Sequence, residues 1–156
     1  MHAIRDARAS ARTHRYAGSR YQPGWLETFL MEPPSSGGGL SGIEALSVAR
    51  YLETRRDTLL VPDAPGLEKV KADTAVVAEG LELYKQFACS SCHRLNGEGE
   101  TIGPELTGVG ERLRPAYMAA NLRDPQRLWP TSEMPNFGLT PEQVRSLVAY
   151  LSTQQP

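Results

Sequence analysis

The sequence predicts an all-α protein, and three observations carry that prediction. Apolar side chains recur at helical spacing between Val76 and Phe87. The segment Thr140-Pro141-Glu142-Gln143 combines a helix cap, a proline at the first helical position and a glutamine that can complete a capping box. No alternating run typical of a strand flanks the cysteine pair Cys89 and Cys92. We therefore expect helices and no sheet.

Three segments are predicted before the main helical region. Residues 1–20 contain five arginines and a single acidic residue, which predicts a basic, solvated arm; an anionic membrane surface or an acidic partner is the alternative reading. We expect residues 21–57 to form a helical extension. Residues 58–73, which contain Pro62, Pro65 and Gly66, are expected to form a linker.

Three helices are predicted within residues 74–156. The first begins near Asp73 or Thr74 and leads directly into the cysteine pair. The second runs from Pro115 to Arg123, because a residue that precedes a proline disfavours helical geometry and Asp124 precedes Pro125. The third follows Thr140. Its predicted apolar face consists of Val144, Leu147, Val148 and Leu151.

The residues Cys89-Ser90-Ser91-Cys92-His93 form a pattern on which haem is attached covalently. Two thiols three positions apart can form thioether bonds to the two vinyl groups of one porphyrin, and the adjacent histidine can then ligate the iron. A redox disulfide is the first alternative, but it would need alternating strands and helices around it. A zinc site is weaker, because the remaining histidines are His2 and His14 near the start.

Further pocket residues follow the motif in order. Gly103-Pro104-Glu105-Leu106 begins ten residues after His93, and Met134-Pro135 begins forty-one residues after it. With these features the chain resembles the class I cytochromes c, which carry one His/Met-ligated haem, over about residues 74–152. The resemblance implies that Cys89 and Cys92 hold one haem c. It also implies that His93 is the proximal ligand, that the Pro104 carbonyl accepts its ring N–H, and that Met134 is the distal ligand.

Other axial ligands are weighed against Met134. Met118 lies on a predicted helix and Met31 in an apolar stretch, where methionine usually fills a core. Met134 lies in a predicted loop, where core packing explains it poorly. Ligation by two histidines would require His2 or His14 to reach back across a long segment.

The resemblance implies further contacts. In the family the first and last helices cross at a glycine, and Gly80, which costs about 1 kcal/mol inside a helix, fits that crossing. Tyr84 and Tyr150 are the expected aromatic partners there. Trp129 is expected to hydrogen-bond a haem propionate, and Asn136 the methionine sulfur.

The chain also resembles itself. Pro23-Gly24-Trp25 with Glu32-Pro33 matches Pro115-Ala116-Tyr117 with Asp124-Pro125, and residues 40–52 match residues 139–151. The first copy lacks the part that corresponds to the Met134 loop. We interpret residues 21–57 as the back half of a degenerate cytochrome c unit that binds no haem; chance similarity between two helix pairs is the alternative. If the copy is real, its front half is expected upstream in a longer parent protein. Otherwise the extra helices are expected to pack on the haem domain of residues 74–156.

Composition limits the remaining classes of function. The 156 residues carry a net charge of −1, no nucleic-acid motif, and no apolar run near the eighteen or so residues of a membrane span. The family resemblance implies a periplasmic or other extracytoplasmic location.

The expected function is electron transfer by haem iron that cycles between Fe(II) and Fe(III). Because two protein ligands would fill both axial positions, we expect a carrier and not an enzyme. The expected partners are other cytochromes, a quinol-oxidising complex or a terminal oxidase. We expect the chain to be a domain or subunit of a respiratory or photosynthetic complex. The parent protein or the complex can be membrane-bound. The alternatives are a free soluble shuttle and a haem-based gas sensor or peroxidase with a displaceable Met134.

Overall fold

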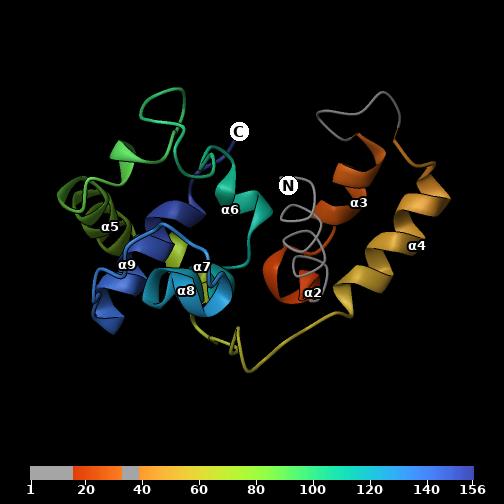
Figure 1. The fold of residues 1–156 in the computed structure, drawn as a ribbon, viewed down its shortest axis with the longest axis horizontal. Helices are drawn as coiled ribbons and strands as arrows, with labels where there is room; N and C mark the ends of the chain where they lie inside the picture. The colour runs from red at the N-terminus through yellow and green to blue at the C-terminus, as the bar shows by residue number, and fades with distance from the viewer. Residues whose placement is uncertain (1–15, 33–38) are drawn as a thin grey trace. The chain divides into compact units, whose positions relative to one another are not determined.

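The computed structural model describes residues 16–32 and 39–156 (Figure 1). Its regular structure is helical. These residues form no extended strand, and their β-type pairing consists of isolated bridge residues, such as the bridge between Leu95 and Glu98. The all-α prediction is therefore confirmed. The chain divides into two compact units, Met1–Val61 and Pro62–Pro156, each with its own apolar cluster. Of the predicted basic arm, residues 1–15 lie outside the described residues.

The second unit begins its long helices where the sequence predicts. Helix α5 spans Thr74–Gln86, and the Asp73 carboxylate caps it by accepting a hydrogen bond from the Val76 N–H at 3.3 Å. Helix α9 spans Pro141–Ser152 and has a capping box. The Gln143 N–H donates to Thr140 Oγ1 at 3.2 Å, and the Thr140 N–H donates to Gln143 Oε1 at 3.0 Å.

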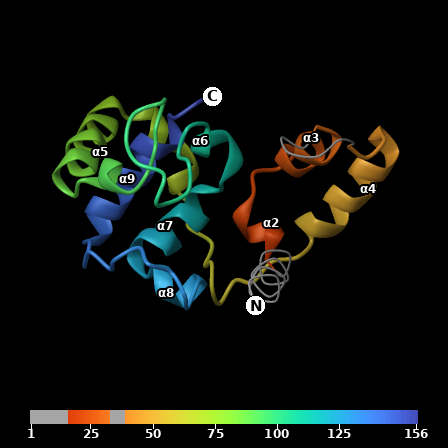
Figure 2. The same cartoon turned by 45° about the horizontal axis from the view of Figure 1, so that its top comes forward.

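Helices α5 and α9 pack side by side in both views (Figure 2). They approach most closely at Gly80, where any Cβ would overlap the carbonyl oxygen of Ser146. The Ser146 hydroxyl donates to Glu79 Oε2 across the crossing at 2.9 Å. Next to it the rings of Tyr84 and Tyr150 lie 5.4 Å apart, tilted by 53°. The predicted glycine crossing and its aromatic pair are both present.

Shorter helices complete the second unit. Helix α6 spans Val109–Arg112, α7 spans Pro115–Arg123 as predicted, and α8 spans Pro125–Leu128. Part of the predicted linker also folds here: residues Leu67–Ala72 form the 3₁₀ helix η1, which packs on α9. Val70 of η1 is almost fully buried in the core that α5, α7 and α9 share.

The first unit contains three described helices: α2 (Ala17–Arg20), α3 (Trp25–Met31) and α4 (Gly42–Glu53). Its small core consists of Ala17, Leu26 and Ala49, with Tyr21, Trp25, Leu30 and Leu52 packed around them. Helix α4 has a capping box between Ser41 and Glu44 like that of α9. None of the helices in the described ranges combines the length and apolarity needed to span a bilayer.

Candidate functional site

The cysteine pair lies on a single tight turn at the end of α5. The chain reverses at Ala88, whose φ of 50° is left-handed, and then forms the 3₁₀ helix η2 (Cys89–Ser91). The N–H groups of Cys92 and His93 both donate to the Cys89 carbonyl, at 3.2 and 3.0 Å. The two cysteines do not form a disulfide, and both are partly exposed. Burial raises the pKa of the Cys89 thiol.

His93 is held by the residues that follow it. Its Nδ1 lies 2.7 Å from the carbonyl oxygen of Pro104. Gly103 lies close to the imidazole, since a Cβ at this position would be 2.5 Å from Cε1 and 2.7 Å from Nδ1. The Gly103 N–H donates to the Cys92 carbonyl at 2.6 Å, which ties the turn to the motif. Because a carbonyl can only accept, Nδ1 carries the proton, and Nε2 keeps a lone pair that can bind a metal.

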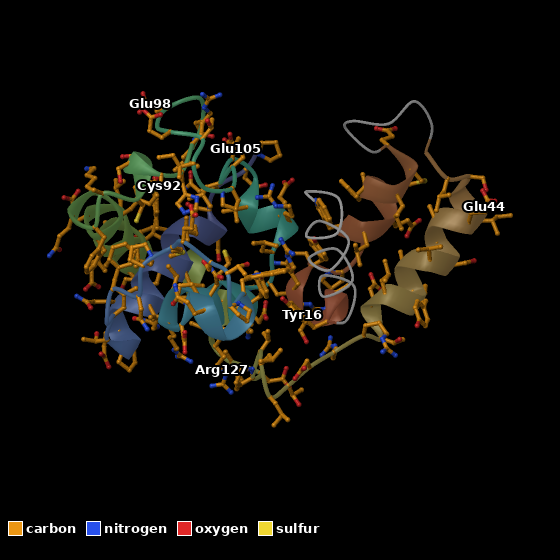
Figure 3. All side chains as sticks on the ribbon, viewed as in Figure 1. Tyr16, Glu44, Cys92, Glu98, Glu105 and Arg127 are labelled. Atoms are coloured by element: carbon orange, nitrogen blue, oxygen red, sulfur yellow. The ribbon has the colours of Figure 1, made fainter. Side chains whose placement is uncertain are left out.

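The loop between His93 and Pro104 is folded back on the motif. The Glu100 N–H donates to the Ser90 carbonyl at 3.0 Å, and the Leu106 N–H donates to the Arg94 carbonyl at 2.8 Å. Figure 3 shows Glu98 at the outer end of this loop, with Cys92 and Glu105 nearer its base. A hydrogen bond from the Thr107 hydroxyl lowers the pKa of Glu105, so this carboxylate stays charged at neutral pH.

Met134 lies in a loop that α8 and α7 hold. Gln126 Nε2 donates to the Met134 carbonyl at 2.7 Å and to the Ser132 carbonyl at 3.1 Å. The Met134 sulfur itself lies 3.6 Å from Asn121 Nδ2, a side chain of α7. Met134 and Cys89 pack against the same apolar core. The loop therefore presents the thioether beside the core that the cysteine turn contacts.

The remaining residues that the sequence analysis considered make other contacts or lie outside the described residues. Asn136 Oδ1 accepts from the Gly138 N–H at 3.0 Å, and the amide nitrogen of Asn121 lies 3.6 Å from the Met134 sulfur. Trp129 Nε1 donates to the Tyr117 hydroxyl at 2.9 Å. Met118 is buried in the core, whereas Met31 ends α3 with 37% of its surface exposed and so does not fill a core. His2 and His14 lie outside the described residues.

Asn121 and Gln126 carry no motif, which is why the sequence did not single them out. A weak signal exists, since asparagine is a poor helix former and Asn121 lies between apolar residues of α7. Two cysteine sulfurs lie on one turn, the imidazole Nδ1 contacts the Pro104 carbonyl, and a thioether packs against the same apolar core. This set of groups fits a covalently attached haem with two protein ligands.

Comparison with known proteins agrees with this fit. Residues 77–155, which are 79 of the 156 residues, match the family model described as Cytochrome c. Subunit 2 of cytochrome c oxidase from Alkalihalophilus pseudofirmus is 31% identical over 93 residues, which cover 53% of this chain and 27% of that protein. The cytochrome c subunit of the cytochrome bc1 complex from Corynebacterium efficiens is 39% identical over 74 residues. These residues cover 47% of this chain and 21% of that protein.

A third relative is a nitric oxide reductase subunit from Paracoccus denitrificans, 34% identical over 87 residues that cover 50% of this chain and 58% of that protein. The matched regions thus make up between about a fifth and three fifths of these relatives. No solved structure matches the chain significantly.

Proposed function

This chain belongs to the cytochrome c family, and we propose that it transfers electrons as a domain or subunit of a respiratory or photosynthetic redox complex. Its cofactor is covalently bound c-type haem, which supplies a one-electron couple between ferrous and ferric iron. Haem electron transfer is the function of its family domain. Membership of a complex is the finer proposal, and it rests on relatives that are named as subunits of such assemblies.

In this proposal the residues of the second unit have distinct tasks. Cys89 and Cys92 would attach the haem through their sulfurs, and His93 and Met134 would be the ligands of its iron. The observation that carries the proposal is the contact of 2.7 Å between His93 Nδ1 and the Pro104 carbonyl. It fixes the imidazole tautomer and leaves Nε2 as the metal-binding nitrogen, and a strong acceptor there raises the basicity of the ligand.

The methionine side determines whether the protein is a carrier or a catalyst. A thioether is a soft, neutral ligand that raises the reduction potential and leaves no open position for oxygen or peroxide. Gln126 holds the Met134 backbone and Asn121 contacts its sulfur, so the ligand is braced at two points. This bracing supports a non-catalytic carrier over a gas sensor or peroxidase, in which Met134 would have to leave.

Carbon monoxide separates those two classes of function. We expect no change in the spectrum when the gas is added to the reduced protein at neutral pH, because Met134 keeps its position. Formation of a carbonyl complex would favour the sensor or peroxidase and contradict the carrier.

Cell fractionation tests the complex. We expect the native protein on the extracytoplasmic side, as the family domain suggests, and in the membrane fraction, co-migrating with quinol-oxidising or terminal-oxidase subunits in native gels. Recovery of all of it from the soluble extracytoplasmic fraction would support a free shuttle instead.

A further inference from the structure

Two glycines, one in each unit, make the same contact. The Gly18 N–H of α2 donates to the Arg55 carbonyl at 2.9 Å, and the Gly110 N–H of α6 donates to the Gln154 carbonyl at 3.2 Å. A Cβ at Gly18 would overlap the carbonyl oxygen of Glu53, and one at Gly110 would overlap that of Ser152. In each unit a short helix therefore crosses the end of a long capped helix at a glycine.

The correspondence extends through the rest of the first unit. Helices α2, α3 and α4 follow one another as α6, α7 and α9 do. Both long helices end alike, since the Thr54 hydroxyl donates to the Tyr51 carbonyl at 2.7 Å and the Thr153 hydroxyl donates to the Tyr150 carbonyl at 2.7 Å. The buried positions also agree. The corresponding pairs are Leu26 and Met118, Ala45 and Val144, and Ala49 and Val148. The structure thus extends the repeat seen in the sequence by the short helix α2, which corresponds to α6, and by the hydrogen bond that its glycine donates.

Several elements of the second unit, namely η1, α5, η2 and α8, have no counterpart among the described residues of the first. Of these, α5 packs most extensively against α9. In the second unit α5 covers the face of α9 that carries Ser146 and Tyr150, and Ser146 is only 2% exposed. The corresponding residues of α4 are Ser47 and Tyr51. Tyr51 is 62% exposed, Ile43 one turn before Ser47 is 83% exposed, and Ser47 is exposed as well. We call Ile43, Ser47 and Tyr51 the open face of α4.

We propose that the open face of α4 is a docking site for an α5-like helix presented by a partner protein. The second unit specifies the chemistry of that helix. It carries a glycine where Gly80 stands, because the crossing leaves no room for a Cβ. An aromatic residue follows four positions later, where Tyr84 contacts Tyr150. An acidic residue precedes the glycine, as Glu79 does, and accepts from Ser47, whose hydroxyl now donates to the Ile43 carbonyl at 2.7 Å.

A second copy of this chain is a poorer occupant, because its own α5 is already packed against its own α9. The proposal does not depend on electron transfer. The open face lies in the first unit, whereas the cysteine turn and both proposed ligands lie in the second.

Nuclear magnetic resonance of the reduced, ¹⁵N-labelled haem protein tests the proposal. The probe is a synthetic peptide with the sequence of residues 73–88, locked as a helix by a link between positions 78 and 82, which are exposed in α5. The link is needed because a free helix of this length is marginal in water. We expect concentration-dependent shifts of the α4 amides around Ile43, Ser47 and Tyr51, with the α9 amides unchanged.

Three matched controls sharpen the result. A peptide with Gly80→Val should bind at least tenfold more weakly, and so should the protein with Tyr51→Glu. The protein with Leu59→Ser, which removes an apolar side chain that is 80% exposed, should bind as the wild type does. The proposal is overturned by an absence of α4 shifts at millimolar peptide, by equal binding of the Gly80→Val peptide, or by α4 signals that change with protein concentration alone. The last result would indicate a second copy on this face.

Discussion

The side-chain amide of Asn121 lies 3.6 Å from the sulfur of Met134, and the two residues come from α7 and from the loop that follows α8. A hydrogen bond to a thioether withdraws electron density from the sulfur, which weakens its donation to ferric iron more than to ferrous iron. Asn121 is therefore expected to tune the potential of the proposed carrier without ligating the iron itself.

Replacement of Asn121 by leucine should lower the reduction potential. If the lost bond contributes about 1 kcal/mol, a one-electron couple shifts by ~40 mV. Spectroelectrochemical titration of the purified protein measures this shift. The matched control is Asn136→Leu, because the contact shown for the Asn136 side chain is with the Gly138 backbone, whereas that of Asn121 is with the sulfur. A larger shift in the Asn136 variant than in the Asn121 variant would contradict the assignment.

Alanine at Gly103 should disturb the imidazole directly. The added Cβ would lie 2.5 Å from His93 Cε1, so the ring or the turn must move. We expect a loss of stability of roughly 1–3 kcal/mol, as for other overpacked sites, together with a changed haem spectrum. Thermal unfolding followed in the haem absorption band measures both. Gly42→Ala is the control, since its Cβ would meet nothing within 4 Å and should leave stability and spectrum unchanged.

Alanine at Gly80 should weaken the crossing of α5 and α9. Its Cβ would overlap the backbone of Ser146, which cannot give way as a flexible side chain could. Denaturant unfolding should show a loss of roughly 1–3 kcal/mol. Ser146→Ala removes only the hydrogen bond to Glu79 and should cost about 1 kcal/mol or less. Equal losses in the two variants would argue against a steric requirement for glycine.

The raised pKa of Tyr84 should make the free energy of unfolding decrease in alkaline solution. Burial raises the pKa of Tyr84 to about 12, from an ordinary value of 10.0. The folded state thus keeps the phenol protonated at a pH where the unfolded chain has released that proton. Its contribution to stability is complete below about pH 10 and is lost as the pH rises toward the folded value. The unfolding free energy should therefore fall less steeply above pH 10 in Tyr84→Phe than in the wild type. Identical slopes would contradict this.

Local chemistry made the long helices predictable. Asp73 and Thr140 are caps whose side chains bond the first turn. The helix crossing at Gly80 was implied by the family resemblance, and Gly80 does lie against Ser146. Other features depend on tertiary contacts that the sequence does not display. Pro62, Pro65 and Gly66 predict a linker over residues 58–73, yet Leu67–Ala72 form a 3₁₀ helix and Val70 is buried against the core.

Some parts of the candidate site could likewise be predicted from the sequence, and others could not. The Cys89-Ser90-Ser91-Cys92-His93 motif and the turn at Pro104 are each contiguous in the sequence, so both could be identified from the sequence. The Asn121 contact joins two segments thirteen residues apart through a side chain with no motif of its own. Asn136 lies closer to Met134 in the sequence, and its amide oxygen accepts from the Gly138 N–H in a local turn.

The most direct test of the account is the absorption spectrum of the oxidised protein beside that of Met134→Ala. A weak band at the red end of the spectrum is characteristic of methionine bound to ferric haem. We predict this band in the wild type and its loss in the variant, with the haem still covalently attached through Cys89 and Cys92. A wild type without the band, or a variant that keeps it, would show that Met134 is not the ligand and would contradict the proposed His/Met-ligated carrier.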